Sequence, residues 1–337
     1  MKKIVFVTQQ VDPAEPTLGA AVALVRALAA EVDEVVVLAL RGDASALPPN
    51  ARLRTFGART RTGRGARFTV ALARELRPRP MAVVAHMSPI YAVLAAPIVR
   101  PLGVRVLLWF THWRRSALLV VAERSSNAVL SVDRTSFPLA SRKLVPIGHG
   151  IDVDEFACVD RSRHGPPMHV VALGRTSEAK GLGVIGEGVR IARDRGVDID
   201  LEVRGPSLTD AERRHRADLR IVQDPVPRTE MPALLARADV LVNNMRAGAP
   251  DKVVYEAGAT CLPVLASNPS LFDLVTEDLR FGRESPDELA DRLEWLAGLG
   301  VAERTALGRR LRARVEEAHS TKTWAAAVMA VASGGTP

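Results

Sequence analysis

Cysteine is scarce in this sequence, since only Cys158 and Cys261 occur among 337 residues. Two cysteines are too few for a disulfide framework, and these two lack the close spacing of metal ligands. Such usage is typical of a protein in a reducing compartment, so we expect a cytoplasmic setting. We likewise expect no bound metal and no cofactor.

Long hydrophobic runs are also lacking. The apolar run "IVFVTQQ" after Lys3 is far too short for the core of a signal peptide. Residues 81–99 carry no formal charge, but Pro89 and Pro97 interrupt them and His86 is polar. A buried strand, a turn and a buried helix explain this stretch better than a membrane span does. We therefore predict no transmembrane segment.

The composition is that of a soluble globular protein, with 47% hydrophobic and 25% charged residues. Its charge is uneven: residues 1–150 hold 21 basic and 9 acidic residues, a net of +12, and the remainder hold 25 and 29, a net of −4. This asymmetry is compatible with an anionic partner for the first half, but an arginine-rich composition produces it equally well.

Apolar runs rich in valine, isoleucine and leucine alternate with helical patterns along both halves of the chain. Examples are "KIVFVTQ" and "EVVVLAL" early on, and "HVVALG" and "DVLVNN" later. Such runs are typical of parallel strands that helices cover on both faces. We predict two α/β domains, residues 1–150 and 151–318, joined by a Gly- and Pro-rich linker near residues 150–167, with a final helix in residues 319–337.

The stretch "LGRTSEAKG" lies where the strand "HVVALG" ends and a helix is expected to begin. Arg175 and Lys180 flank this turn, and lysine is uncommon here, with 6 lysines against 40 arginines. Two cations beside the unpaired amides of a helix N-terminus suit a diphosphate group. The alternative is that both residues are merely solvated in a surface turn.

Residues 181–186, "GLGVIG", match the dinucleotide-binding pattern G-x-G-x-x-G. That pattern requires its first glycine directly after the strand and an acidic residue at the end of the next strand. Here Gly181 is expected in the helix, and the next strand, "DIDLEVRG", ends in Arg204. An NAD-dependent oxidoreductase therefore remains only a weak alternative. The Asp198–Asp200 pair is interpreted as the structural entrance to that strand.

A third stretch, "APDKVVYEAGATCLPVLAS", predicts a helix that begins after Pro250 and runs into a strand. Glu256 lies about a turn and a half into this helix, and its two carboxylate oxygens match the vicinal hydroxyls of a ribose. Lys252 lies one turn earlier on the same helical face, so an i,i+4 salt bridge is the alternative interpretation.

Taken together, "VPIGHGIDVDEF", "GRTSEAKG" and "DKVVYEAGATCLPVLAS" resemble retaining glycosyltransferase family 4. The resemblance implies a GT-B fold, in which two Rossmann-like domains with parallel sheets face each other across a cleft. It implies that Arg175 and Lys180 bind the diphosphate of a nucleotide-sugar donor and take part in catalysis, and that Glu256 binds its ribose. Lys252 and Val253 are expected to line the same donor site.

In the first domain, the resemblance implies that Gly19 belongs to a glycine-bearing donor-site loop and that His112, in "WFTHW", is the active-site histidine. A core or surface role for His112 is the alternative. His86, Arg59 and Arg61 are weaker candidates for the acceptor side. The last two belong to a segment with six arginines, residues 51–67, which suits an anionic acceptor or an acidic membrane surface. With few aromatic residues nearby and no reading module, nucleic acid is not expected.

The implied activity is metal-independent transfer of a sugar, with retention, to a hydroxyl of a small-molecule, glycan or lipid-linked acceptor. One departure from the family concerns Gly248, which stands where the first glutamate of E-x7-E is expected. That carboxylate usually contacts the donor sugar, so its absence leaves a second possibility open, a non-catalytic GT-B module that binds nucleotide or glycan.

Overall fold

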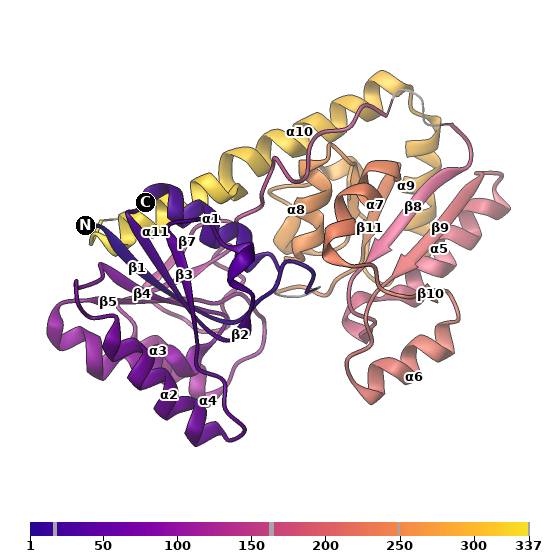
Figure 1. Cartoon of the computed structure of the whole chain (residues 1–337). Coiled ribbons are helices and arrows are strands. Elements are labelled where there is room, and N and C mark those ends of the chain that lie inside the picture. Colours follow the sequence, from indigo (N-terminus) through magenta and orange to yellow (C-terminus); the bar gives the residue numbers. More distant parts are fainter. Residues whose placement is uncertain (16–18, 162–164, 249, 336–337) are drawn as a thin grey trace. The chain divides into compact units, whose positions relative to one another are not determined.

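The structure is a computed structural model that describes residues 1–15, 19–161, 165–248 and 250–335. The chain divides into two compact units (Figure 1). The first comprises Met1–Gly150 together with Ala318–Pro337, and the second comprises Ile151–Glu317.

The first unit contains a seven-stranded parallel sheet with the order β3-β2-β1-β4-β5-β6-β7. The register places Ile4 beside both Val35 and Ala82, so the apolar runs lie side by side in the centre. The strands are β1 (Lys3–Val11), β2 (Glu34–Gly42), β3 (Ala51–Thr55), β4 (Ala82–His86), β5 (Arg105–Trp109), β6 (Ala128–Ser131) and β7 (Leu144–Pro146).

Helices cover both faces of this sheet, as continuous apolar strands require. One face packs on α2 (Arg61–Arg74), α3 (Pro89–Val99) and α4 (Ala117–Ser125), through alternate strand residues such as Val5, Val83 and Leu108. The other face is covered by α1 (Ala21–Glu31) and the final helix α11 (Thr321–Ala332). Trp324 of α11 is fully buried edge-on against Trp109 of β5, at 5.9 Å between ring centroids, and burial of such a side chain contributes roughly 1.5–3 kcal/mol.

The second unit contains a five-stranded parallel sheet with the order β10-β9-β8-β11-β12. Its strands are β8 (Met168–Leu173), β9 (Ile199–Arg204), β10 (Val222–Gln223), β11 (Val240–Asn243) and β12 (Val264–Ala266). Its helices are α5 (Leu182–Asp194), α6 (Asp210–Leu219), α7 (Met231–Arg237), α8 (Lys252–Ala259), α9 (Pro286–Gly298) and α10 (Val301–His319). The predicted α/β class with parallel sheets is confirmed.

Two local predictions are also confirmed. The uncharged stretch 81–99 forms strand β4, a turn and helix α3, and none of the described helices is long and apolar enough to cross a membrane. The glycines of "GLGVIG" lie at the cap and within the first turns of α5, which begins at Leu182. Because β8 already ends at Leu173, they are too late to form a dinucleotide-binding turn.

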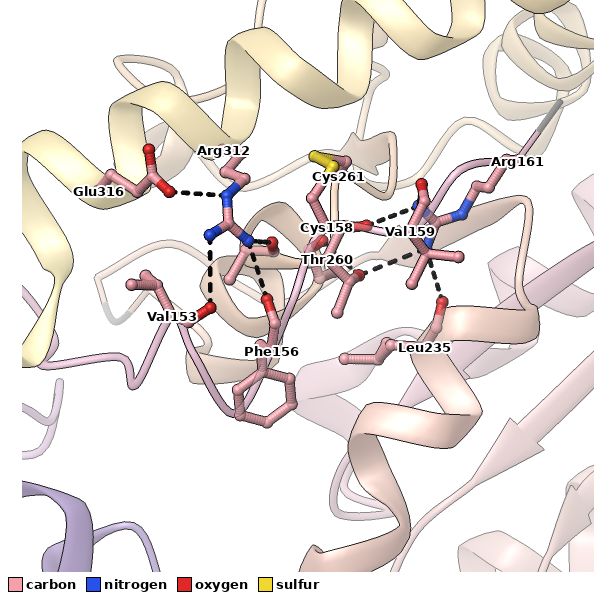
Figure 2. Close-up of a disulfide and its surroundings, with 12 residues drawn as sticks. Val153, Phe156, Cys158, Val159, Arg161, Leu235, Thr260, Cys261, Arg312 and Glu316 are labelled. Atoms are coloured by element: carbon pink, nitrogen blue, oxygen red, sulfur yellow. Dashed lines mark hydrogen bonds and ion pairs between the residues drawn. A yellow bond between two sulfur atoms is a disulfide. The ribbon is translucent and has the colours of Figure 1, made fainter.

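The structure joins Cys158 to Cys261 in a disulfide bond, which is not what the expected reducing compartment favours (Figure 2). Cys158 lies in the linker, and Cys261 follows the C-terminal end of α8. Cysteine counting tests for a framework of several bridges, and it does not detect a single bridge between distant positions.

Two arginines form hydrogen bonds that hold the same linker segment, residues 151–161, against the second unit (Figure 2). We call this segment the strap. Arg161 donates to the carbonyl oxygens of Thr260 at 2.6 Å and Leu235 at 2.8 Å, and burial lowers the pKa of its guanidinium to about 10. Arg312 of α10 donates to the carbonyl oxygen of Phe156 at 3.1 Å. The strap is therefore tied to α8 and α10 along its length.

Part of the arginine-rich segment 51–67 is structural and does not form a docking surface. Arg52 and Arg54 lie on β3 and form ion pairs with Glu75, whose side chain is buried. Burial would raise the pKa of Glu75, but the hydrogen bond and charge of Arg52 hold that pKa below its usual value. Lys3 is also buried, 4.0 Å from Glu75, and burial lowers the pKa of its ammonium group.

Candidate functional site

The carboxyl end of β8 holds a buried cation. Gly174 follows the strand with φ +118°, and a Cβ atom there would come within 2.4 Å of the Lys180 Nζ atom. Glycine therefore leaves room for the Lys180 side chain, which reaches back across the strand end to the carbonyl oxygen of Leu173 at 3.2 Å. Lys180 ends the short helix η3 (Glu178–Lys180) and is only 7% exposed.

Lys180 forms an ion pair with Asp251, the residue that caps the N-terminus of α8. Asp251 also accepts a hydrogen bond at 2.9 Å from the side chain of Asn243, at the end of β11. The two motifs therefore meet at the carboxyl edge of the second sheet, where ligands of such sheets bind.

Arg175 has a different acidic partner. Its Nη2 atom donates to Glu212 Oε1 at 2.7 Å, and Glu212 also accepts from the amides of Leu208 and Thr209 at the start of α6. Burial would raise the pKa of Glu212, but the Leu208 amide and Arg175 hold it below its usual value. Arg175 remains 48% exposed, so a bound anion can reach its guanidinium group.

Glu256 is buried in α8 and paired with a residue that the sequence did not single out. Its Oε1 atom accepts from Arg228 Nη1 at 2.6 Å, and both residues are less than 10% exposed. Arg228 also lies 3.4 Å from Glu155 of the strap and 5.1 Å from the ring centroid of Phe156. Burial raises the pKa of Glu155, and the charge of Arg228 opposes that rise.

Lys252 and Val253 occupy the first turn of α8. Val253 is 7% exposed and contributes to the core. Burial lowers the pKa of the Lys252 ammonium group to about 8, although the charge of Glu256 acts in the opposite direction. The first amides of this helix carry the positive end of its dipole, and that of Val254 donates to the carbonyl oxygen of Asp251 at 3.0 Å. The N-terminus of α8 therefore lies between Lys252 and the ion pair of Lys180 with Asp251.

Gly248 has φ +99°, which is a left-handed backbone conformation that favours glycine. A glutamate at this position would be strained, so the backbone conformation accounts for glycine in place of the expected carboxylate residue. The amide of Gly248 lies 3.4 Å from Ser270 Oγ.

In the first unit, the two candidate histidines differ in burial. His86 ends β4, is 6% exposed, contacts Thr8 Oγ1 at 3.1 Å through Nδ1, and stacks on Phe6. His112 follows β5 and is partly exposed. Its Nδ1 atom accepts from the amide of Arg114 at 2.9 Å, and its ring stacks on that of Trp113. His86 therefore lies in a core environment, and His112 does not.

The remaining candidates of the first unit lie in loops. A Cβ atom on Gly19 would come within 2.5 Å of the carbonyl oxygen of Glu15, so this position has no room for a side chain. Residues 16–18 of the predicted glycine loop lie outside the described residues. Arg59 and Arg61 are exposed, just before and at the start of α2.

Among the described residues, no group of three or more His, Cys, Asp or Glu side chains is arranged to hold a metal ion. The charges near the predicted donor site come instead from basic residues and their carboxylate partners. Sequence reasoning missed Arg228, Glu155 and Glu212 because their partners lie 28, 73 and 37 positions away. No local pattern carries that information.

No family model and no curated protein matches the sequence. Solved structures do match over nearly the whole chain. Sucrose-phosphate synthase from Thermosynechococcus elongatus is 17% identical with TM-score 0.76, and the match covers 98% of both chains. An E. coli structure described as trehalose-6-phosphate bound with UDP-2-fluoro glucose is 12% identical with TM-score 0.71, covering 100% of both. TarM from S. aureus, in a complex that includes UDP, is 9% identical with TM-score 0.73, covering 98% of this chain and 100% of that one. These likenesses show that the chain has the GT-B fold.

Proposed function

We propose that this protein is a retaining glycosyltransferase that transfers a sugar from a nucleoside-diphosphate sugar to an acceptor hydroxyl. One observation carries the proposal, the meeting of buried Lys180 with the N-terminus of α8 at the carboxyl edge of the second sheet. This arrangement offers a diphosphate one full charge and the positive end of a helix dipole. Glu256, one turn further along α8, has a second carboxylate oxygen for a ribose hydroxyl.

In the proposed reaction, the acceptor oxygen forms a bond to the anomeric carbon as the bond from that carbon to the diphosphate breaks. The acceptor proton passes to a phosphate oxygen of the leaving group, so no protein base is required. Arg175 and Lys180 stabilise the negative charge that develops on the diphosphate. A bound donor must displace Glu212 and Asp251 from these cations, and this competition limits donor affinity.

A second candidate function is supported by Gly248, which supplies no carboxylate for the donor sugar. A GT-B module without that group could bind a nucleotide or glycan and catalyse nothing. Donor hydrolysis in the absence of acceptor separates the two functions. Hydrolysis by the wild type that is lost in Glu256→Ala supports the transferase, whereas binding without hydrolysis supports the module.

The donor itself is best identified by thermal shift with UDP, GDP, ADP and dTDP sugars. A ligand that binds the native state raises the melting temperature. At a concentration of 100 times its Kd, it adds about 2.7 kcal/mol to the free energy of unfolding. We expect one nucleotide series to stabilise the protein and the NAD(P) cofactors to leave it unchanged. Stabilisation by NAD(P) alone would instead favour an oxidoreductase.

We expect Arg175→Ala and Lys180→Ala each to weaken binding of the nucleoside diphosphate by roughly tenfold or more, since each removes a charge-assisted contact of about 1.5–3 kcal/mol. Binding of the bare nucleoside should change much less. Titration calorimetry with both ligands makes the comparison, and Arg190→Ala, in an exposed ion pair with Glu187, is the matched control. Equal losses for nucleoside and diphosphate contradict this assignment.

We expect turnover to be unaffected by EDTA, because basic residues and helix amides stabilise the leaving diphosphate in the proposed site. The measurement is sugar transfer with and without chelator, followed by added magnesium or manganese. Activity that disappears with EDTA and returns with either ion contradicts metal independence.

We expect His112→Ala to lower turnover by about 100-fold with little change in nucleoside-diphosphate affinity, since an imidazole acting on the sugar or acceptor is not needed to bind the nucleotide. Turnover and melting temperature should be measured on the same preparation. His86→Ala is the control, because buried His86 should affect stability first. A destabilised His112 variant with normal turnover per folded molecule would make His112 a structural residue.

A further inference from the structure

The net positive charge of the protein comes from one segment, residues 57–124. This segment contains 12 arginines and 2 glutamates, a net of +10, whereas the rest of the chain holds 34 basic and 36 acidic residues, a net of −2. Together these give the overall +8. The segment forms α2, α3 and α4 together with strands β4 and β5 and the connecting loops, and the three helices lie side by side on one face of the first sheet (Figure 1).

The arginines of this face are not neutralised. Ten of the twelve are exposed, and within the described part of the chain none of these ten forms an ion pair. Of the two glutamates, Glu75 is buried against Arg52, and Glu123 accepts a hydrogen bond from Ser141 at 2.6 Å. In the second unit, several exposed arginines do form ion pairs, and Arg190, for example, pairs with acids on its own helix.

Apolar side chains are exposed on the same helices. Of the nine large hydrophobic side chains that are exposed among the described residues, six lie in this segment. They are Val70, Ile90, Leu102, Trp113, Leu118 and Val121, with exposures from 38% to 52%. Exposed apolar residues grouped on one face commonly mark an interaction surface.

The C-terminal end of α2 adds a hollow suited to an anionic group. Arg74, Arg77 and Arg79 line a surface cavity of about 770 Å³ together with Pro101 and Leu102. Arg79 donates to the carbonyl oxygen of Leu102, which joins the α2 end to η2 (Arg100–Leu102). Three guanidinium groups and no carboxylate surround this space.

We propose that the outer face of α2, α3 and α4 docks on a bilayer that contains anionic phospholipid, with the cavity at Arg74, Arg77 and Arg79 receiving a lipid phosphate. Arginine interspersed with aliphatic side chains is the pattern of an interfacial helix, where guanidinium groups contact phosphates and apolar groups enter the acyl boundary. Stacking on nucleic acid bases requires several exposed aromatic rings, and Trp113 is the one such large side chain in this set. The inference does not depend on the proposed transferase activity.

The test is sedimentation of the full chain with vesicles, either of phosphatidylcholine alone or of phosphatidylcholine mixed with phosphatidylglycerol, at about 0.1 M salt and again at about 1 M. We expect binding to the anionic vesicles at low salt, weaker binding at high salt, and little binding to neutral vesicles. Equal binding to both kinds of vesicle, or none to either, overturns the proposal.

Variants locate the surface. The triple variant R74S/R77S/R79S should weaken vesicle binding on the order of 100-fold, at roughly fivefold per arginine. A second variant at the other end of the face, R61S/R114S/R115S, gives an independent check in case the first variant folds poorly. The control R214S/R309S/R310S removes the same charge from exposed positions of the second unit and should bind as the wild type does. If the control loses as much vesicle binding as the two face variants do, the proposal is overturned.

The apolar side chains distinguish a bilayer from a soluble polyanion. The variant V70S/L118S/V121S keeps every charge, so it should lose vesicle binding while its retention by single-stranded DNA stays unchanged. Circular dichroism and melting temperature confirm that each variant is folded. If this variant binds vesicles as well as the wild type does, a membrane surface is contradicted. The same holds if the wild type binds DNA more tightly than it binds anionic vesicles.

Discussion

Reduction of the Cys158–Cys261 bond is expected to lower the free energy of unfolding of the second unit by up to about 4–5 kcal/mol. The two cysteines are 103 positions apart, and closing a loop of about this length in the unfolded chain costs about 4.7 kcal/mol in the chain-entropy model. A loss of this size corresponds to a fall in melting temperature on the order of 10 °C for a domain of this size. The bridge is therefore expected to be a main determinant of stability in the second unit.

Urea unfolding with and without a phosphine reductant, followed by hydrogen exchange of peptides from residues 151–317, measures this effect. The variant Cys158→Ser is the matched control, because it should show the lower stability at once and should not respond to reductant. Identical unfolding curves for oxidised and reduced protein contradict the expected role of the bridge.

The strands and helices were predictable because the information for them is local. Runs such as "IVFV" and "VVVLAL" are apolar at every position, and only a strand covered on both faces buries all of them. The turn at Arg175 and the helix after Pro250 were also predicted, because residues close in sequence determine where each begins. Two α/β domains followed from the order of these elements, and the GT-B fold followed from the family resemblance.

The partners of the candidate residues were not predictable in the same way. Lys180 and Asp251 are 71 positions apart, and no local pattern in the sequence links them. Their pairing depends on the approach of two strand ends, which in turn requires Gly174 and the register of β8 beside β11. The same holds for Arg228, which reaches Glu256 only after α8 has packed. Composition indicated the excess of arginine, but only the fold shows which arginines are neutralised.

The second large effect is expected at Arg228. Replacing it with methionine keeps much of the side-chain volume but leaves Glu256 as a buried charge without its partner, 4% exposed. Removing one member of a buried ion pair destabilises a protein by about 3–5 kcal/mol. Arg237→Met is the control, since Arg237 forms an exposed pair with Glu202 and such pairs contribute about 0–1 kcal/mol.

A double variant distinguishes the loss of the ion pair from the loss of side-chain packing. In R228M/E256Q the buried charge is gone, so much of the lost stability should return, whereas a loss caused by packing alone would persist. Nucleoside binding should remain impaired in the double variant if the Glu256 carboxylate binds the ribose. Full recovery of both stability and nucleoside affinity would remove Glu256 from the proposed donor site.

The pH dependence of Arg228→Met gives a further check. Burial raises the pKa of Glu155 and the charge of Arg228 opposes that rise, so removing Arg228 raises the pKa of Glu155 further in the folded state. A carboxyl group whose folded pKa exceeds its unfolded value costs stability at high pH, and the cost disappears as pH falls toward the unfolded value. The stability difference between wild type and Arg228→Met should therefore be smaller at about pH 5 than at about pH 8, as measured by urea unfolding at both values. A difference that is constant with pH, or one that grows as pH falls, would show that Arg228 stabilises the unit through its stacking on Phe156 and not through its charge.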